Sequence, residues 1–278
     1  MSFAAPLPLR APGAGVGSSV LRLGAVSYLN ARPLVHGLEA EPRVRLEGDV
    51  PSRVARRLHA GEVDLGMIPS IEYTFGRYDI VPGIAIGSRG PVRSVSLYLS
   101  RPLDDVRRVA LDTSSRTSVA LVKVLLRERL GRDPEYVPMA PALVDMLAVA
   151  DAALLIGDPA LEEENTVTSL DVGEEWERLT GLPFVYAFWA GPRGVVTRAG
   201  VARLRAALDE GLTAVPQIAA AYANGRPERA ATYESYLRAN VVYRLGSEEI
   251  AGLREFYRRA YALDLAPTNP ELSFHADQ

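Results

Sequence analysis

Five polar residues stand together where a strand is expected to run into a helix. They are Thr113, Ser114, Ser115, Arg116 and Thr117. The first turn of a helix has backbone N–H groups without intrahelical partners and the positive end of the helix dipole, so it attracts anions. Hydroxyls can donate hydrogen bonds to a carboxylate, and a guanidinium can bind it at two points. The run predicts an anion site, although taken alone it favours a simpler role in which Ser114 or Ser115 caps the helix.

Other polar residues also follow predicted strands. Asn30 ends the segment VSYLN, where its amide offers a donor and an acceptor; a turn role is the alternative because Pro33 is close. Ser94 follows a Gly-Pro turn and faces either a ligand or solvent. Glu72 and Asp158 have the chemistry of a base, but capping of the next helix is the favoured role of both.

The elements that must position these residues alternate along the chain. From Leu21 onward short apolar segments alternate with helical periodicity, which is typical of an α/β protein with mostly parallel sheets and helices on both faces. Helices are expected over residues 51–59, 118–129, 199–212, 227–239 and 247–262. Ligands of such sheets bind beyond the carboxyl ends of the strands. That rule selects residues 27–32, 69–72, 112–117 and 157–160, and residues 90–94 join them just before a predicted hinge segment. We therefore expect two lobes with a small anion held in a cleft between them.

The chain is expected to divide into two lobes and a flexible leader. Pro and Gly interrupt the apolar residues at the N-terminus and leave no signal-peptide core. The predicted parts are a leader of residues 1–19, one lobe of residues 20–98 and 192–278, and a second lobe of residues 99–191. Two β-rich segments, residues 94–100 and 182–190, are predicted to pair as crossover strands that act as a hinge.

The composition of the chain limits the kinds of partner and of chemistry that we expect. The net charge is −3 and the basic residues are scattered, so neither nucleic acid nor a membrane is an expected partner. The absence of cysteine excludes disulfides, thiolate catalysis and cysteine-ligated zinc. His36, His59 and His275 have no metal-ligand spacing and are expected at the surface, so no metal site is predicted. The sequence leaves the oligomeric state open, with a dimer as one option.

Six segments, taken in order, resemble a known family. They are VSYLNARPL, GEVDLGMIPSIEY, SRGPVRSVSLY, DTSSRTSVALVK, ADAALLIGDPAL and WERLTGLPFVYAFWA, within residues 26–190. The family comprises enzymes of the futalosine route to menaquinone with a periplasmic-binding-protein-like fold of type II, and the chain is most similar to the chorismate dehydratases. The resemblance implies a cytoplasmic hydro-lyase that converts chorismate to 3-[(1-carboxyvinyl)oxy]benzoate and water without cofactor or metal. The alternatives are the sister 1,4-dihydroxy-6-naphthoate synthases, a non-catalytic binding protein for small carboxylates, and a ligand-sensing domain.

The same resemblance assigns catalysis to Asn30 and Ser94. Because neither an amide nor a hydroxyl is a good base near neutral pH, we expect the enolpyruvyl carboxylate of the substrate to take the proton. The two side chains would position that carboxylate and polarise the departing hydroxyl. The residues expected to bind substrate are Ser70, Thr113, Ser114, Ser115, Arg116, Thr117, Gly157 and Asp158.

Overall fold

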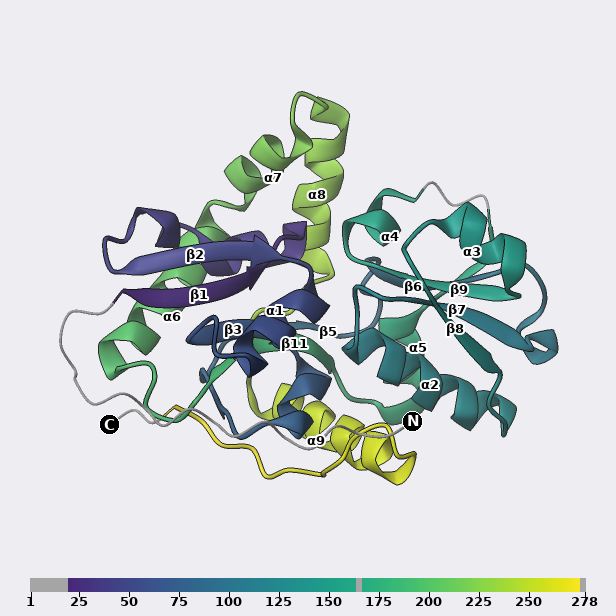
Figure 1. The fold of residues 1–278 in the computed structure, drawn as a ribbon. Helices are drawn as coiled ribbons and strands as arrows, with labels where there is room; N and C mark the ends of the chain where they lie inside the picture. The colour runs from purple at the N-terminus through teal and green to yellow at the C-terminus, as the bar shows by residue number, and fades with distance from the viewer. Residues whose placement is uncertain (1–19, 164–166, 276–278) are drawn as a thin grey trace.

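Two β-sheets lie side by side in the computed structural model, which describes residues 20–163 and 167–275 (Figure 1). The first sheet has the order β2-β1-β3-β11-β4, and β5 pairs with β11. Its strands are β1 (Leu21–Val26), β2 (Val44–Asp49), β3 (Leu65–Pro69), β4 (Asp79–Ile80), β5 (Ile86–Ser88) and β11 (Phe184–Gly191). β1 is parallel to β2 and β3, whereas β11 is antiparallel to β3, β4 and β5.

The second sheet has the order β10-β6-β9-β7-β8. Its strands are β6 (Val95–Leu99), β7 (Arg108–Asp112), β8 (Glu135–Met139), β9 (Ala152–Ile156) and β10 (Ser169–Asp171). β7 is parallel to β8 and β9, and β6 is antiparallel to β9 and β10. Every residue of β9 is buried, because helices cover both faces of this sheet (Figure 1).

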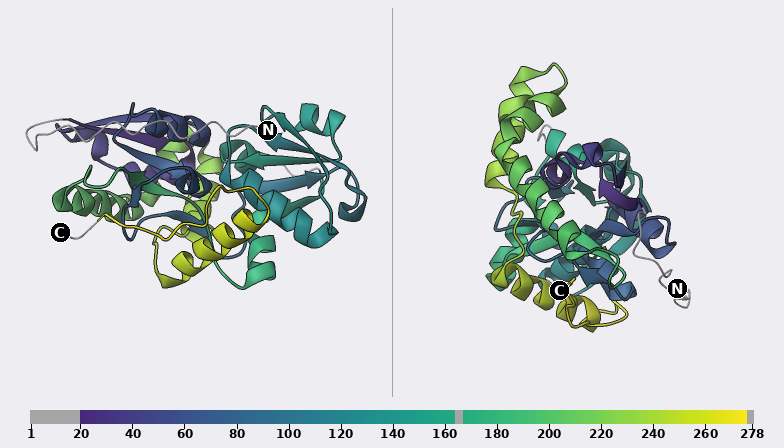
Figure 2. Two further views of the ribbon diagram at one scale, coloured as in Figure 1. Left: turned by 60° about the horizontal axis from the view of Figure 1, so that its bottom comes forward. Right: turned by 90° about the vertical axis from the view of Figure 1, so that its left-hand side faces the viewer.

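Helices surround both sheets. In the first lobe they are η1 (Leu29–Val35), η2 (Leu38–Ala40), α1 (Pro51–His59), η3 (Ser70–Phe75), α6 (Arg198–Thr213), α7 (Val215–Ala223), α8 (Pro227–Ala239) and α9 (Ser247–Ala262). In the second lobe they are η4 (Leu103–Asp105), α2 (Thr117–Leu130), α3 (Leu143–Val149), α4 (Asp158–Glu162) and α5 (Val172–Thr180). α7 and α8 form a hairpin that projects from the first lobe and stands beside α4 (Figure 1 and Figure 2).

An aromatic contact joins the lobes where the chain returns to the first sheet. Trp176 on α5 is fully buried and packs edge-on against Phe184 of β11 and Phe256 of α9, with ring centroids 5.3 Å and 6.2 Å away. The Trp176 indole N–H donates to the carbonyl of Pro183 at 3.2 Å. The crossover from α5 to β11 is therefore fixed by burial and by a hydrogen bond.

The predicted hinge pairing is wrong. β6 lies between β9 and β10, and β11 lies within the first sheet, so the two segments do not pair with each other. All residues of both strands are buried, as expected of central strands covered on both faces. The predicted lobe boundaries are corrected accordingly, because residue 98 lies inside β6 and residues 184–191 belong to the first sheet.

The remaining predictions on chain organisation concern the leader, membrane-spanning helices and the exposure of His275. The predicted leader, residues 1–19, lies outside the described residues. Within the described part of the chain, no helix is both long enough and apolar enough to cross a membrane. The prediction that His275 lies at the surface is wrong: His275 is buried, and its backbone N–H donates to the carbonyl of Ile80 on β4 at 2.9 Å.

Candidate functional site

The two residues predicted to be catalytic meet at a third that the sequence did not indicate. Asn30 is in the first turn of η1, and Ser94 directly precedes β6. The hydroxyl of Tyr236, on α8, donates to the Ser94 Oγ at 2.8 Å, and the Asn30 side chain lies near enough to influence the same hydroxyl. Three segments far apart in the chain thus bring their polar side chains together between the lobes, and we call this group the Asn30–Tyr236–Ser94 chain.

This chain is sheltered from solvent. Ser94 and Tyr236 are each 1% exposed. Burial raises the pKa of the Tyr236 hydroxyl well above its usual value, and the interaction with the Asn30 amide only partly opposes that rise. The tyrosine therefore stays a neutral hydrogen-bond donor. The Asn30 Oδ1 is buried and has no hydrogen-bond partner among residues 20–163 and 167–275, so it remains an acceptor for a ligand.

The turn that opens α4 holds the loop after β1 in place. The Asp158 carboxylate accepts hydrogen bonds from the Leu29 N–H at 3.0 Å and from the Tyr222 hydroxyl. Burial raises the pKa of the Asp158 carboxyl, although both hydrogen bonds act against that rise. Gly157 donates its N–H to the Ser94 carbonyl at 2.7 Å. Gly157 and Asp158 thus connect the segments that bear Asn30 and Ser94.

The hydroxyl run faces the first lobe, but most of its groups already have partners. The Ser114 hydroxyl donates to Asp112 at 2.6 Å and lies 3.2 Å from the Tyr28 hydroxyl. The Ser115 Oγ accepts from the Ser118 N–H at 3.2 Å, which is a capping contact. Thr117 Oγ1 accepts from the Ile71 N–H at 3.1 Å. Binding of a carboxylate by this run stays a prediction, and any ligand there must share these groups.

The other predicted binding residues of this region differ in exposure and in hydrogen-bond partner. Thr113 is exposed, and its N–H donates to the Met139 carbonyl at 3.0 Å. Ser70 is fully buried and donates its hydroxyl to the Val185 carbonyl at 2.7 Å. The Arg116 guanidinium binds the Glu72 carboxylate at 2.8 Å. Arg116 thus crosses between the lobes to a protein carboxylate.

Comparison with known proteins assigns the family. Residues 21–262 match the family model for menaquinone biosynthesis. The chain belongs to this family. A chorismate dehydratase of Thermus thermophilus is 34% identical over 266 residues, which cover 88% of this chain and 96% of that relative. A chorismate dehydratase of Campylobacter jejuni is 25% identical over 242 residues, which cover 86% of this chain and 93% of its own length.

Solved structures similar to this menaquinone biosynthesis family member support the fold. A protein of Archaeoglobus fulgidus superposes with a TM-score of 0.68 at 17% identity, covering 88% of this chain and 98% of that chain. The alkanesulfonate-binding protein of Xanthomonas axonopodis pv. citri gives 0.65 at 19% identity, covering 92% and 96%. The periplasmic aliphatic sulphonate binding protein of Escherichia coli gives 0.62 at 18%, covering 93% and 94%. The predicted two-lobed, periplasmic-binding-protein-like fold is confirmed.

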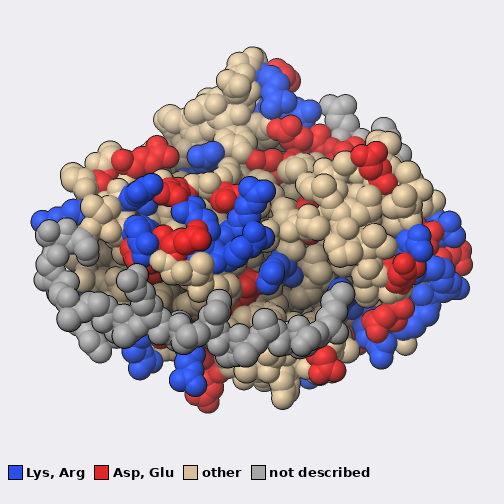
Figure 3. Space-filling view, viewed as in Figure 1, with Lys and Arg blue, Asp and Glu red and all other residues tan. Residues whose placement is uncertain are grey.

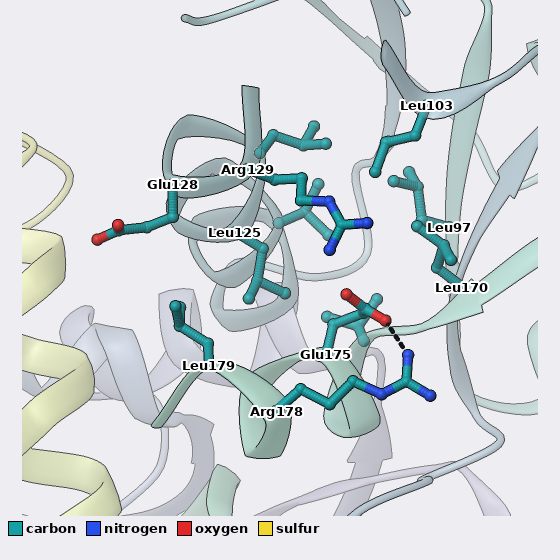
Figure 4. Close-up of a pocket in the computed structure, with 12 residues that line it drawn as sticks. Leu97, Leu103, Leu125, Glu128, Arg129, Leu170, Glu175, Arg178 and Leu179 are labelled. Carbon is teal, nitrogen blue, oxygen red and sulfur yellow. Dashed lines mark hydrogen bonds and ion pairs between the residues drawn. The ribbon is translucent and has the colours of Figure 1, made fainter. Parts of the chain in front are cut away.

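A separate cavity of about 260 Å³ opens on the second lobe of this family member, between α2, α5 and the strands β6 and β10 (Figure 4). Its walls are mostly leucine and valine side chains, such as Leu97, Leu125 and Leu170. At its rim Arg178 is paired with Glu175 at 2.6 Å. None of the residues predicted from the sequence to bind substrate lines it. The polar groups suited to a carboxylate substrate lie between the lobes, so we place the candidate site there.

Charge and metal-binding groups do not indicate another site. On the face shown in Figure 3, basic and acidic side chains are mixed over the first lobe, and those of the second lobe lie mainly toward its outer edge. Within the described residues, no group of three or more His, Asp or Glu side chains is placed to hold a metal ion.

Asp171 fixes the turn that leads into Ser94. Its carboxylate accepts from the N–H groups of Val92 at 3.0 Å and Arg93 at 2.6 Å, and it caps α5 through two further N–H groups. Burial raises the pKa of the Asp171 carboxyl, and these four backbone hydrogen bonds oppose the rise. Arg93 has a φ of 62°, which is uncommon for a side chain of its size. The Asp171 contacts therefore hold a strained residue next to Ser94.

We expect Asp171→Ala to lower the free energy of unfolding by about 2 kcal/mol, because a helix loses its cap and buried donors lose their acceptor. Urea unfolding measures this change. Asp171→Asn keeps one oxygen as an acceptor and should lose roughly half as much. If Asp171→Ala were as stable as the unchanged protein, the turn would be held by other contacts.

A buried carboxylate also connects the lobes beside the hydroxyl run. Glu72 is 1% exposed, and it binds His59 Nε2 at 2.7 Å and Arg116 at 2.8 Å. The His59 Nδ1 lies 2.8 Å from the Tyr78 hydroxyl. Burial alone would raise the pKa of the Glu72 carboxyl, but the interactions with His59 and Arg116 outweigh it and hold this pKa below its usual value. Of the two roles left open by the sequence, neither helix capping nor general base describes these contacts.

We expect Glu72→Gln to lower the free energy of unfolding at pH 7 by about 2 kcal/mol. The folded-state pKa of Glu72 lies below the unfolded value of 4.5, so its stabilisation is complete above that value and is lost as pH falls through the folded pKa. Urea unfolding from pH 7 to acid should show the two proteins converging. Glu62→Gln, which removes an exposed partner of Arg57, should change little. A difference that stayed constant with pH would contradict this role of the carboxylate.

Proposed function

We propose that this chain is a hydro-lyase that dehydrates chorismate to 3-[(1-carboxyvinyl)oxy]benzoate in menaquinone biosynthesis. The observation that carries the proposal is the Asn30–Tyr236–Ser94 chain, which joins both lobes in a protein of this family. The named relatives, which are chorismate dehydratases, match this chain over most of its length. The futalosine route and a cytoplasmic location belong to the same proposal, and the oligomeric state stays open.

The reaction requires a protein that orients the substrate more than one that supplies a strong base. Loss of water makes the diene ring aromatic, so the product side is strongly favoured. A proton leaves the ring carbon that bears the enolpyruvyl ether, and the C–O bond to the neighbouring hydroxyl breaks. The enolpyruvyl carboxylate accepts that proton and passes it to the departing hydroxide, which leaves as water, so the carboxylate is regenerated. Neutral hydrogen-bonding groups that hold the carboxylate and the hydroxyl are therefore sufficient.

Asn30 and Ser94 fit that task. The free Asn30 Oδ1 can accept the hydrogen of the departing hydroxyl, and the Ser94 hydroxyl can donate to its oxygen. Both groups are buried between the lobes, so water competes weakly for them. Hydrogen bonds between the lobes, such as those from Leu29 and Tyr222 to Asp158, must open to admit a substrate and close again over it.

The direct test is incubation of the purified chain with chorismate. Loss of the diene absorbance, with the product identified by mass spectrometry and NMR, would support the proposal. The heat-denatured protein is the control for the spontaneous decay of chorismate. Chorismate that survives at the rate of this control would contradict the dehydratase. Cyclic dehypoxanthinyl futalosine would then test the sister synthase activity, and calorimetry with chorismate would test a non-catalytic binding role.

A further inference from the structure

We infer that Tyr236 is a positioning residue that orients the Ser94 hydroxyl so that its proton points at the ligand. The inference rests on the proposed function and adds a residue from the C-terminal helices to the site. Tyr236 is on α8, 142 positions from Ser94 in the chain, and the two oxygens are 2.8 Å apart. Both side chains are 1% exposed, so the contact is shielded from water.

The direction of the hydrogen bonds follows from counting donors. The Asn30 amide nitrogen can only donate, and the influence of Asn30 on Tyr236 is to lower the pKa of the phenol, as a donor near its oxygen does. The single phenolic proton of Tyr236 must then point elsewhere, and the Ser94 Oγ is its acceptor. Because Ser94 accepts from Tyr236, its own proton is left over. No acceptor for that proton is present among the described residues, so it is available to a ligand.

The two ends of the Asn30–Tyr236–Ser94 chain are complementary. The Ser94 end offers a donor, and the Asn30 end offers the unpaired, buried Oδ1 as an acceptor. A hydroxyl group is the ligand group that satisfies both at once, since it accepts one hydrogen bond and donates another. A carboxylate would satisfy only the Ser94 end and would leave Oδ1 facing a negative oxygen. The chain therefore selects the alcohol of the substrate, which is the group that departs.

Tyr236 can hold this direction at every working pH. Burial keeps its hydroxyl protonated, so it remains a donor to Ser94. Without the phenol, the Ser94 hydroxyl would be free to rotate, and the Asn30 amide would lose its acceptor. Hydrogen bonds in a line also polarise one another, which strengthens the final donor.

The test compares Tyr236→Phe, Ser94→Ala and the double variant in turnover of chorismate by the full chain. Tyr236→Phe removes one oxygen and should lower kcat roughly 10- to 100-fold with KM within about threefold, because the phenol touches Ser94 and not the substrate. The double variant should lose much less than the product of the two single losses, since Tyr236 acts mainly through Ser94. Independent, multiplying effects of the two substitutions would overturn the inference, as would a Tyr236→Phe variant with unchanged kcat.

Two other tyrosines are matched controls for loss of a buried phenol. Tyr233 lies one turn earlier on α8 and its hydroxyl binds Glu162, and Tyr243 is buried with its hydroxyl unpartnered among the described residues. Tyr233→Phe and Tyr243→Phe should keep kcat within about twofold. Equal losses in all three variants would show a general packing effect and would contradict a specific role of Tyr236. Circular dichroism and the unfolding midpoint confirm that each variant is folded.

A binding measurement separates this inference from the proposed function. Calorimetry with chorismate on the same variants measures how much binding affinity each substitution removes, without requiring turnover. Binding without turnover would refute the dehydratase, and a non-additive loss of affinity in Tyr236→Phe and Ser94→Ala would still support the inference. Turnover with additive losses would refute the inference alone. A wild-type chain that neither binds nor converts chorismate would refute both.

Discussion

Ser94→Ala and Asn30→Ala are each expected to lower kcat for chorismate by roughly 100- to 1,000-fold while the protein stays folded. Ser94→Ala removes the donor to the departing hydroxyl, and Asn30→Ala removes both the free acceptor Oδ1 and the amide that orients Tyr236. The loss should appear in kcat more than in KM, because the hydrogen bond from Ser94 strengthens as negative charge develops on the departing oxygen, while Asn30 holds that hydroxyl in position. Steady-state kinetics with purified variants measures it.

Ser96→Ala is the matched control for this prediction. Ser96 is on β6, two residues after Ser94, is only 8% exposed, and does not touch the Asn30–Tyr236–Ser94 chain. Its substitution should leave kcat within about twofold. If Ser94→Ala and Asn30→Ala turned chorismate over as fast as Ser96→Ala, the catalytic roles proposed for both residues would be wrong.

The sequence was sufficient to predict elements in which local pattern and topology agree. The segment from 108 to 130 has an apolar strand, a polar turn and a helix without an internal breaker, and β7 and α2 form there within one residue of expectation at the helix ends. The rule on carboxyl ends of parallel strands selected the loop that contains Asn30, and the turn before the predicted hinge supplied Ser94; the structure brings both residues to Tyr236. These predictions succeeded because the residue pattern within each segment favours the same backbone conformation that the fold adopts there.

Long-range pairing could not be derived in the same way. An apolar run such as VSLYL is compatible with a hinge strand or with a central strand. A strand buried on both faces lacks the alternation of apolar and polar residues, so its sequence does not indicate which strands lie beside it. The hinge prediction failed for this reason. The contact of Arg116 with Glu72 likewise joins residues 44 positions apart. The sequence therefore gave no sign that the Arg116 guanidinium binds a carboxylate of the protein itself.

Tyr236 was missed because its surroundings look like ordinary core. In ATYESYLRAN, Tyr233 and Tyr236 stand three residues apart on one face of α8, which predicts packing and gives no sign of a hydrogen bond to Ser94. The one available signal was chemical: most buried tyrosines have a hydrogen-bond partner for the hydroxyl, and Tyr236 is buried. That tendency does not say which residue the partner is.

Gly157→Ala is expected to lower the free energy of unfolding by about 3 kcal/mol and to reduce kcat at least about tenfold. Gly157 has a φ of 66° and a ψ of −144°, a region that is almost restricted to glycine. A Cβ at this position would lie 2.6 Å from the ring of Tyr28. The ring must move, and the loop that carries Asn30 moves with it. Urea unfolding and steady-state kinetics on one preparation measure the two effects.

Gly181→Ala supplies the comparison for backbone strain without a contact. Gly181 has a φ of 69° and a ψ of 10°, and a Cβ at this position would meet no atom of the described residues within 4 Å, so alanine there should cost only about 1 kcal/mol. In the Gly157→Ala and Tyr28→Ala double variant, the clash with the ring is absent while the backbone strain remains. The double variant should therefore be more stable than the sum of the two single losses predicts. Strict additivity would show that strain at residue 157, and not the displaced Tyr28 ring, causes the whole loss.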